Sequence, residues 1–294
     1  MQRIVPNVWC QGNAADVGEF YSAVLPNTSA EVTMFYPAED LPDFQRDFAG
    51  QPLVVDVTVG GYQIRLINAG NEFRPTPALS FILNMDPLFF DGGEEEARTR
   101  IHSIWEAFAD GGQVRMALGE YPHSKLYGWI EDRFGVNWQL MLTNPAGDRR
   151  AMVMPQFLFT GPAAQARQAI DLYTGLLPDS GTGMVMPQPA DPHGILFAEF
   201  HLAGQWFSAM DGGTAHDFTF TPGISLEVSC ADQEEIDKLW GALSAVPEAE
   251  QCGWCVDRYG VSWQIVPQNM GDLMKNPGAY QRMLNMKKIV IAEL

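Results

Sequence analysis

The chain has 294 residues, of which 46% are hydrophobic, and it carries a formal net charge of −18. That charge argues against nucleic acid or an anionic membrane as a partner, because both would repel the protein at long range. The hydrophobic content excludes a disordered chain, and the apolar runs are shorter than the roughly 20 residues of a membrane span. The four cysteines are too few for a disulfide framework, so we expect a reducing, cytoplasmic setting.

The hydrophobic pattern predicts alternating strands and helices along the chain. The first residues lack a long apolar stretch, so we expect no signal peptide. Apolar residues at helical spacing predict four helices, around residues 17–24, 101–108, 169–176 and 236–243. Asn13, Pro162 and Asp232 stand where helix starts are expected. Strands are predicted in the first half near residues 3–11, 29–36, 52–59, 62–68, 78–85, 113–119, 125–131 and 136–142.

The chain also repeats itself. Residues 132–140 (DRFGVNWQL) return as residues 257–265 (DRYGVSWQI), with six of nine positions identical, and residues 20–26 and 61–70 match residues 172–178 and 204–213. The order is preserved, which predicts two homologous domains, 1–147 and 148–294, each built from two units of one strand, a helix and three further strands. After its second helix the second half is shorter, so one strand there is expected to be truncated or lost. The C-terminal tail is predicted to be helical over 270–286 and extended over 287–292, closing an edge that would otherwise be exposed.

Four units of this kind resemble the vicinal oxygen chelate (VOC) fold of glyoxalase and bleomycin-resistance proteins. Stretches at 195–200, 209–213, 218–225, 233–240, 251–254, 257–267 and 286–289, with 112–118, 127–129 and 132–140, resemble its PhnB-like branch, whose domains carry the name 3-demethylubiquinone-9 3-methyltransferase. The resemblance implies an α+β fold in which paired βαβββ units form half-open curved sheets, or cups. No glycine-rich nucleotide loop follows a predicted strand, which argues against methyl transfer.

In metal-dependent members of this superfamily, histidine and glutamate side chains on the strands hold a divalent metal. The corresponding positions fall near Pro6 and Pro155, Arg65 and Ser208, Ser80 and Ser225, and Gln139 and Gln264. These residues do not supply the imidazole and carboxylate donors that such a metal needs. We therefore expect no metal site of the usual design and no cofactor.

Residues two apart on a strand share a face, which indicates what lines each cup. We expect one cup per half. The candidate ligand-binding residues are Asp56, Arg65, Ser80, Gln139 and Trp129 in the first half, and Ser208, Ser225, Glu227, Trp254 and Gln264 in the second. Glu199 and His201 share a strand face and form a candidate acid–base pair, with an ordinary surface pair as the alternative.

Three functions remain open at this point. The first is a small-molecule binding protein that holds a polar metabolite or antibiotic-like ligand in a cup without the usual metal ligands. The second is a divalent-metal-dependent lyase, isomerase or dioxygenase of the VOC type, and the third is a degenerate, structural pseudo-dimer. Single-domain relatives pair two copies, so the resemblance implies a monomeric pseudo-dimer or a homodimer.

Overall fold

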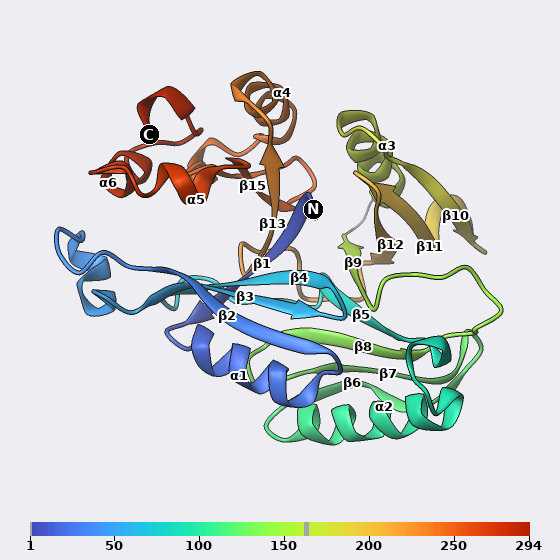
Figure 1. Cartoon of the computed structure of the whole chain (residues 1–294). Coiled ribbons are helices and arrows are strands. Elements are labelled where there is room, and N and C mark those ends of the chain that lie inside the picture. Colours follow the sequence, from blue (N-terminus) through green and yellow to red (C-terminus); the bar gives the residue numbers. More distant parts are fainter. Residues whose placement is uncertain (1, 162–164) are drawn as a thin grey trace.

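The computed structural model describes residues 2–161 and 165–294, and Pro162, expected at a helix start, lies outside these ranges. The chain folds into four consecutive units and a C-terminal tail (Figure 1). Unit 1 contains β1 (Ile4–Gln11), α1 (Ala14–Val24), β2 (Thr28–Phe35), β3 (Pro52–Val59) and β4 (Tyr62–Ala69). Unit 2 contains β5 (Leu79–Met85), α2 (Gly93–Ala109), β6 (Gln113–Tyr121), β7 (Ser124–Glu131) and β8 (Asn137–Leu142). Unit 3 contains β9 (Val153–Thr160), α3 (Ala166–Leu176), β10 (Gly181–Gln188), β11 (Asp191–Leu202) and β12 (Gln205–Gly213). Unit 4 contains β13 (Ile224–Cys230), α4 (Gln233–Leu243), β14 (Trp254–Val256) and β15 (Ser262–Pro267).

The strands predicted in the first half and all four helices are confirmed. The start of α4 is capped as expected, since Asp232 Oδ1 accepts a hydrogen bond from the Glu235 amide at 2.9 Å. Asn13 stands at the N-cap position of α1, as expected, but its side chain does not cap the helix. Its Oδ1 accepts from the amide of Gln11 at 3.1 Å, and the first amide of α1, on Ala14, donates to Asn68 Oδ1 at 3.2 Å.

The two sheets each combine strands from both halves of the sequence. Sheet A has the order β14-β15-β13-β1-β4-β3-β2, and sheet B has the order β10-β11-β12-β9-β5-β8-β7-β6. The first strands of units 1 and 4, β1 and β13, pair antiparallel, and so do the first strands of units 2 and 3, β5 and β9. The expectation of one cup within each half is therefore wrong, because the first strand of every unit pairs with a unit of the other half.

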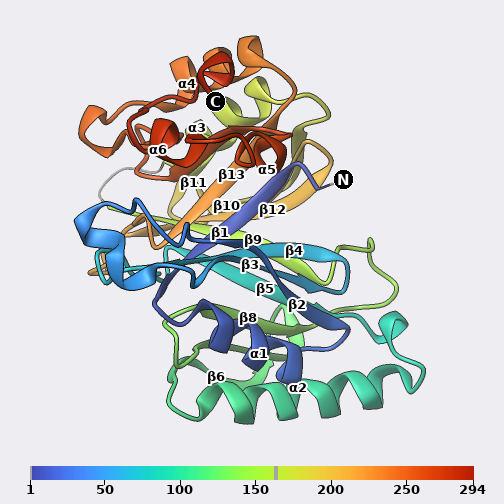
Figure 2. The ribbon, with the colours of Figure 1, turned by 60° about the vertical axis from the view of Figure 1, so that its left-hand side comes forward.

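The helices, in contrast, associate within each half. In both views α1 and α2 lie beside each other at one end of the molecule and α3 and α4 at the other (Figures 1 and 2). Phe20 of α1 and Phe108 of α2 have ring centroids 6.0 Å apart, and Lys238 of α4 donates to the Leu176 carbonyl of α3 at 2.9 Å. The helices of each half thus pack together, while one continuous hydrophobic core runs through both halves.

The repeated motif forms a buried carboxylate network in each half. Asp132 Oδ2 accepts hydrogen bonds from the Tyr21 hydroxyl at 2.6 Å and from Trp138 Nε1 at 3.1 Å. Its Oδ1 accepts from the amides of Phe134 and Val136 at 2.9 and 3.0 Å. The second copy repeats this arrangement around Asp257, with Tyr173, Trp263, Tyr259 and Val261 as donors. The most recognisable part of the repeat therefore fixes α1 and α3 to the turns before β8 and β15.

Unit 4 lacks a counterpart of β6, which confirms the expected loss of a strand. The tail takes its place at the edge of sheet A, since the carbonyls of Met286 and Lys287 accept from the amides of Cys252 and Gly253 at 2.8 and 2.7 Å. The expected single helix is wrong. Two short helices, α5 (Met270–Leu273) and α6 (Ala279–Leu284), are separated by a turn in which Gly278 has φ 75°. The expected extended segment forms no strand; residues 291–293 are a 3-10 turn.

Across residues 2–161 and 165–294, none of the helices is long and apolar enough to span a membrane.

Candidate functional site

The helix-free face of each sheet carries the polar residues. Leu66, Val228 and Ile265 are fully buried on the helix side of sheet A. They alternate with Arg65, Glu227 and Gln264, which therefore share the opposite face. We call this face cup A. It carries Asn7, Asp56, Arg65, Ser225, Glu227, Trp254 and Gln264. The corresponding face of sheet B is cup B. It carries Ser80, Trp129, Gln139, Gln156, Glu199 and Ser208.

Cup A is centred on the guanidinium of Arg65. Its Nη1 donates to both carboxylate oxygens of Glu227, at 2.6 and 2.7 Å, and its Nε donates to Asp56 Oδ1 at 2.8 Å. Asn7 Nδ2 donates to Gln264 Oε1 at 2.7 Å and to Glu227 Oε2 at 3.3 Å. The Oδ1 of Asn7 is buried and has no hydrogen-bond partner, so cup A contains an unsatisfied acceptor.

Cup B is built from neutral side chains at its centre. Tyr127 donates to Gln139 Oε1 at 2.6 Å, and Gln139 Nε2 donates to Ser80 Oγ at 2.9 Å. Ser208 Oγ lies 3.4 Å from Gln156 Oε1. The indole Nε1 of Trp129, which lies opposite Gln139 on β7, is buried without a partner. Cup B thus contains an unsatisfied donor.

An arginine–carboxylate pair occupies the same place in both cups. Asp56 lies opposite Arg65, and Glu199 lies opposite Ser208, at equivalent positions of units 1 and 3. In cup A the guanidinium comes from Arg65 on β4. In cup B the equivalent residue is a serine, and Arg150, from the segment before β9, reaches Glu199 Oε2 at 2.8 Å instead. Two non-equivalent arginines therefore place a guanidinium against equivalent carboxylates.

Arg150 is also held by an aromatic ring. Its guanidinium carbon lies 4.0 Å from the ring centroid of Trp206, which is two residues before Ser208 on β12. Its side chain is 16% exposed and that of Glu199 is 15% exposed, so solvent reaches the pair. The Nε of Arg150 is buried without a partner. The sequence contained no signal for Arg150 as a site residue, because it lies in the turn-rich segment between the halves.

The structure places the predicted site residues in cups whose composition differs from the expectation. Asp56 and Arg65 join Ser225, Glu227, Trp254 and Gln264 in cup A, while Ser80, Trp129 and Gln139 join Ser208 in cup B. The first-strand position is one residue away from the prolines, because Asn7 and Gln156 face the cups and Pro6 pairs with Leu226 on the helix side.

The candidate acid–base pair has separate partners. Glu199 binds Arg150, whereas His201 Nδ1 lies 3.0 Å from the Asp179 carbonyl and its ring packs on Trp206. The two side chains share a strand face, as predicted, but the structure gives them no common hydrogen bond among the residues it describes. Their catalytic role stays a prediction.

The cup residues do not fit the metal that the fold family implies. In cup B the central donors are amides and hydroxyls, and in cup A the central carboxylate, Glu227, is bound by the guanidinium of Arg65. Carboxylate, imidazole and thiolate side chains are the main ligands of divalent transition metals in proteins. Within the described ranges, no three His, Cys, Asp or Glu side chains are grouped as metal ligands.

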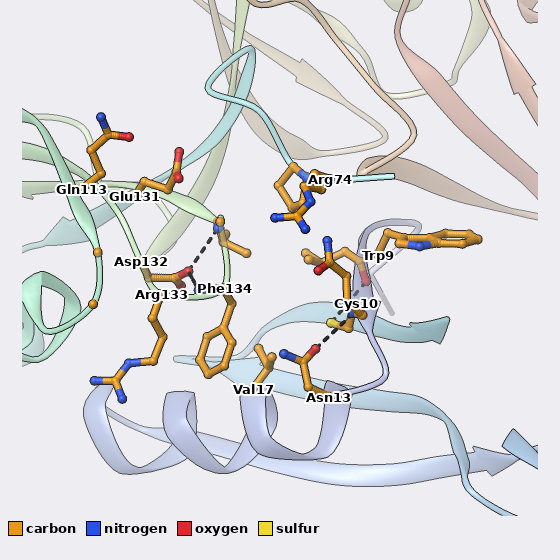
Figure 3. Close-up of a pocket in the computed structure, with 17 residues that line it drawn as sticks. Trp9, Cys10, Asn13, Val17, Arg74, Gln113, Glu131, Asp132, Arg133 and Phe134 are labelled. Carbon is orange, nitrogen blue, oxygen red and sulfur yellow. Dashed lines mark hydrogen bonds between the residues drawn. The ribbon is translucent and has the colours of Figure 1, made fainter. Parts of the chain in front are cut away.

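A separate cavity of about 280 Å³ lies on the helix side, between the start of α1, the turn before β8 and Arg74 (Figure 3). Asp132 lines it, but its carboxylate oxygens are occupied by the network described above. Arg133 points away from the cavity in Figure 3 and pairs with Asp110 at 2.6 Å. Burial raises the pKa of the Cys10 thiol, which therefore stays protonated and unreactive. The unsatisfied groups of Asn7, Trp129 and Arg150 lie in the cups, so we take the cups rather than this cavity as the candidate site.

Comparison with known proteins agrees with this architecture. A family model described as 3-demethylubiquinone-9 3-methyltransferase matches residues 2–141 and 151–266. The chain belongs to this family. The two matches correspond to the two halves of the repeat, and no curated protein matches the sequence.

Solved structures similar to this 3-demethylubiquinone-9 3-methyltransferase family member include some that match half of the chain and some that match nearly all of it. A PhnB protein from Bacillus cereus is 24% identical with a TM-score of 0.39, and the match covers 48% of this chain and 100% of that one. Glyoxalase I from Zea mays is 12% identical with a TM-score of 0.49, over 92% of this chain and 95% of that one. A candidate dioxygenase from Bacillus subtilis is 11% identical with a TM-score of 0.49, over 98% and 97%.

Proposed function

We propose that the protein binds small polar molecules in its cups, using arginine rather than a metal to hold them. The observation that supports this most strongly is the arginine–carboxylate pair of each cup. Arg65 and Arg150 come from different positions of the fold, yet both reach a carboxylate at the equivalent place on β3 or β11. A pair needed only for folding would be expected to come from equivalent residues of the two copies.

The lining of each cup suits such a ligand. Beyond its polar floor, cup A is walled by the apolar cluster of Val54, Ile67 and Ala69, against which Trp9 and Met34 pack. In cup B, Phe197 and the exposed Met186 lie opposite each other beyond Glu199. A few placed polar groups with apolar walls are typical of small-molecule sites. Family membership supports the fold, and the binding activity is our proposal.

The experiment is a thermal-shift screen of a metabolite library with the wild type and with Arg65→Lys and Arg150→Lys. Lysine keeps the charge but loses the planar fork of the guanidinium. Each variant should therefore fold normally and bind ligand poorly in one cup. Arg98→Lys, in an exposed pair with Glu94 on α2, is the matched control. We expect compounds that raise the Tm of the wild type and the control, but not of one cup variant.

The proposal is wrong if every stabilising compound acts equally on all four proteins. If no compound in the library stabilises any of them, the structural pseudo-dimer is the better interpretation.

A further inference from the structure

The buried polar atoms of cup B that lack a partner are hydrogen-bond donors. Trp129 Nε1 and Arg150 Nε are buried N–H groups without a partner. Gln156 Nε2 donates to Met210 Sδ at 3.0 Å, and a thioether is a weak acceptor. A buried donor left unpaired costs about 1–3 kcal/mol, and an acceptor from outside the chain, a water or a ligand, would remove that cost.

Cup A has the opposite character. Trp254, the counterpart of Trp129, is satisfied, since its Nε1 donates to Ser225 Oγ at 3.1 Å. The unsatisfied atom of cup A is an acceptor, Asn7 Oδ1, and two carboxylates surround the single guanidinium. The two cups therefore differ in the partner that they lack: cup B lacks hydrogen-bond acceptors, and cup A lacks a donor.

We infer that cup B takes a ligand whose oxygen atoms accept hydrogen bonds, and that its ligand is a small carboxylate. This inference rests on the proposed function, since it assigns a ligand class to one of the two cups. Trp206 stacks on the guanidinium of Arg150 and Glu199 binds its Nη2, which leaves the Nε–H for the ligand. Trp129 adds a neutral donor from β7. Phe197 and Met186 offer an apolar surface to the rest of the molecule.

Charge at the pair also favours a carboxylate in cup B. Arg150 is bound by one half-buried carboxylate, Glu199, while the second, Asp148, is 3.8 Å away and 91% exposed. Arg65 in cup A is bound by Asp56 and Glu227, with 17% and 9% of their side chains exposed. The guanidinium of cup B is thus the less neutralised of the two, and an anion gains more there.

The test uses the indole N–H signals of the full-length protein in ¹⁵N-correlated NMR spectra. The Trp129 signal is assigned with Trp129→Phe, and the Trp254 signal, from the satisfied indole of cup A, is the internal control. The probes are acetate, succinate and benzoate, with benzamide and benzylammonium as neutral and cationic partners of benzoate. Salt is kept at a physiological level, because the charge of −18 otherwise repels every anion.

We expect at least one carboxylate to move the Trp129 signal in a saturable way and to leave the Trp254 signal in place. Its affinity should fall by about tenfold or more in Arg150→Met, the loss expected for a hydrogen bond to a charged group. Arg98→Met should bind as the wild type does. Benzamide should bind more weakly than benzoate, and benzylammonium should leave Trp129 unmoved.

The inference is overturned if none of the carboxylates moves the Trp129 signal, or if benzylammonium moves it at least as strongly as benzoate. The proposed function survives that result if other compounds from the thermal-shift screen act through Arg65 or Arg150. Failure of both experiments removes both proposals.

Discussion

Asp132 and Asp257 show what it costs to use a charged residue as a structural element. Both carboxylates are almost fully buried, and both accept four hydrogen bonds. Burial nevertheless prevails over these bonds and raises the pKa of Asp132 to about 6 and that of Asp257 above its usual value. A group whose pKa is higher in the folded state binds its proton more tightly there, so folding is favoured as the pH falls.

This gives a prediction for Asp132→Asn. The wild type should gain stability relative to the variant as the pH falls from 7.5 to 5, because Asp132 becomes protonated in the folded state while its unfolded pKa stays near 3.8. The expected gain is about 1 kcal/mol in the free energy of unfolding. Urea unfolding at both pH values measures it, and this range stays above the isoelectric point of about 4.5. Asp110→Asn, at an exposed ion pair, is the control; parallel pH curves for wild type and Asp132→Asn would contradict the prediction.

The candidate site was predictable from sequence in its residue types but less so in its grouping. Strand alternation placed Arg65, Glu227 and Gln264 on a cup face correctly. Asn7 and Gln156 were missed by one position, because the first-strand site was assigned to the proline that precedes each of them. Arg150 could not be predicted as a site residue. It lies in a segment between the halves that has no strand or helix periodicity to indicate which face its side chain joins.

At the scale of elements, the C-terminal tail compensates for a missing strand. It supplies two carbonyls to the edge next to β14 and packs its own apolar side chains there, around the fully buried Ile289. It also reaches the far edge of sheet A, where Tyr280 Oη donates to Gln45 Oε1 at 2.9 Å and its ring meets that of Tyr36. The tail therefore ties the first unit to the last, and sheet A is secured at both edges.

We predict that Ile289→Ala lowers the free energy of unfolding by about 2–4 kcal/mol, the usual cost of a cavity at a buried aliphatic residue. The exposed Leu88→Ala, which changes a side chain of the same size, should cost less than about 0.5 kcal/mol. Chemical denaturation of the two variants makes the comparison. Equal effects would mean that the tail adds little to the stability of the fold.

At the scale of the molecule, the halves depend on each other through two antiparallel pairings, β1 with β13 and β5 with β9. The sequence repeat predicted the units and their order, because it lies in the local patterns of each unit. It could not predict which units share a sheet. Every unit has an open first strand, and identical patterns leave the choice of partner to three-dimensional packing.

Separating the halves should therefore expose both pairing edges at once. We predict that residues 1–147 expressed alone self-associate, because unpaired edge strands seek partners. Co-expression with residues 148–294 should instead give a one-to-one complex, which size-exclusion chromatography with light scattering would detect. A stable, monomeric first half would show that the cross-half sheets are dispensable for folding.

The joining of four units in one chain also has a genetic consequence. In a dimer of identical subunits, each substitution appears twice, and symmetry forces both binding sites to change together. Here Arg65 has no equivalent arginine in the other cup, since its counterpart is Ser208, and Arg150 belongs to one cup alone. A single mutation can thus alter one cup and spare the other, so the two sites are free to diverge toward different molecules.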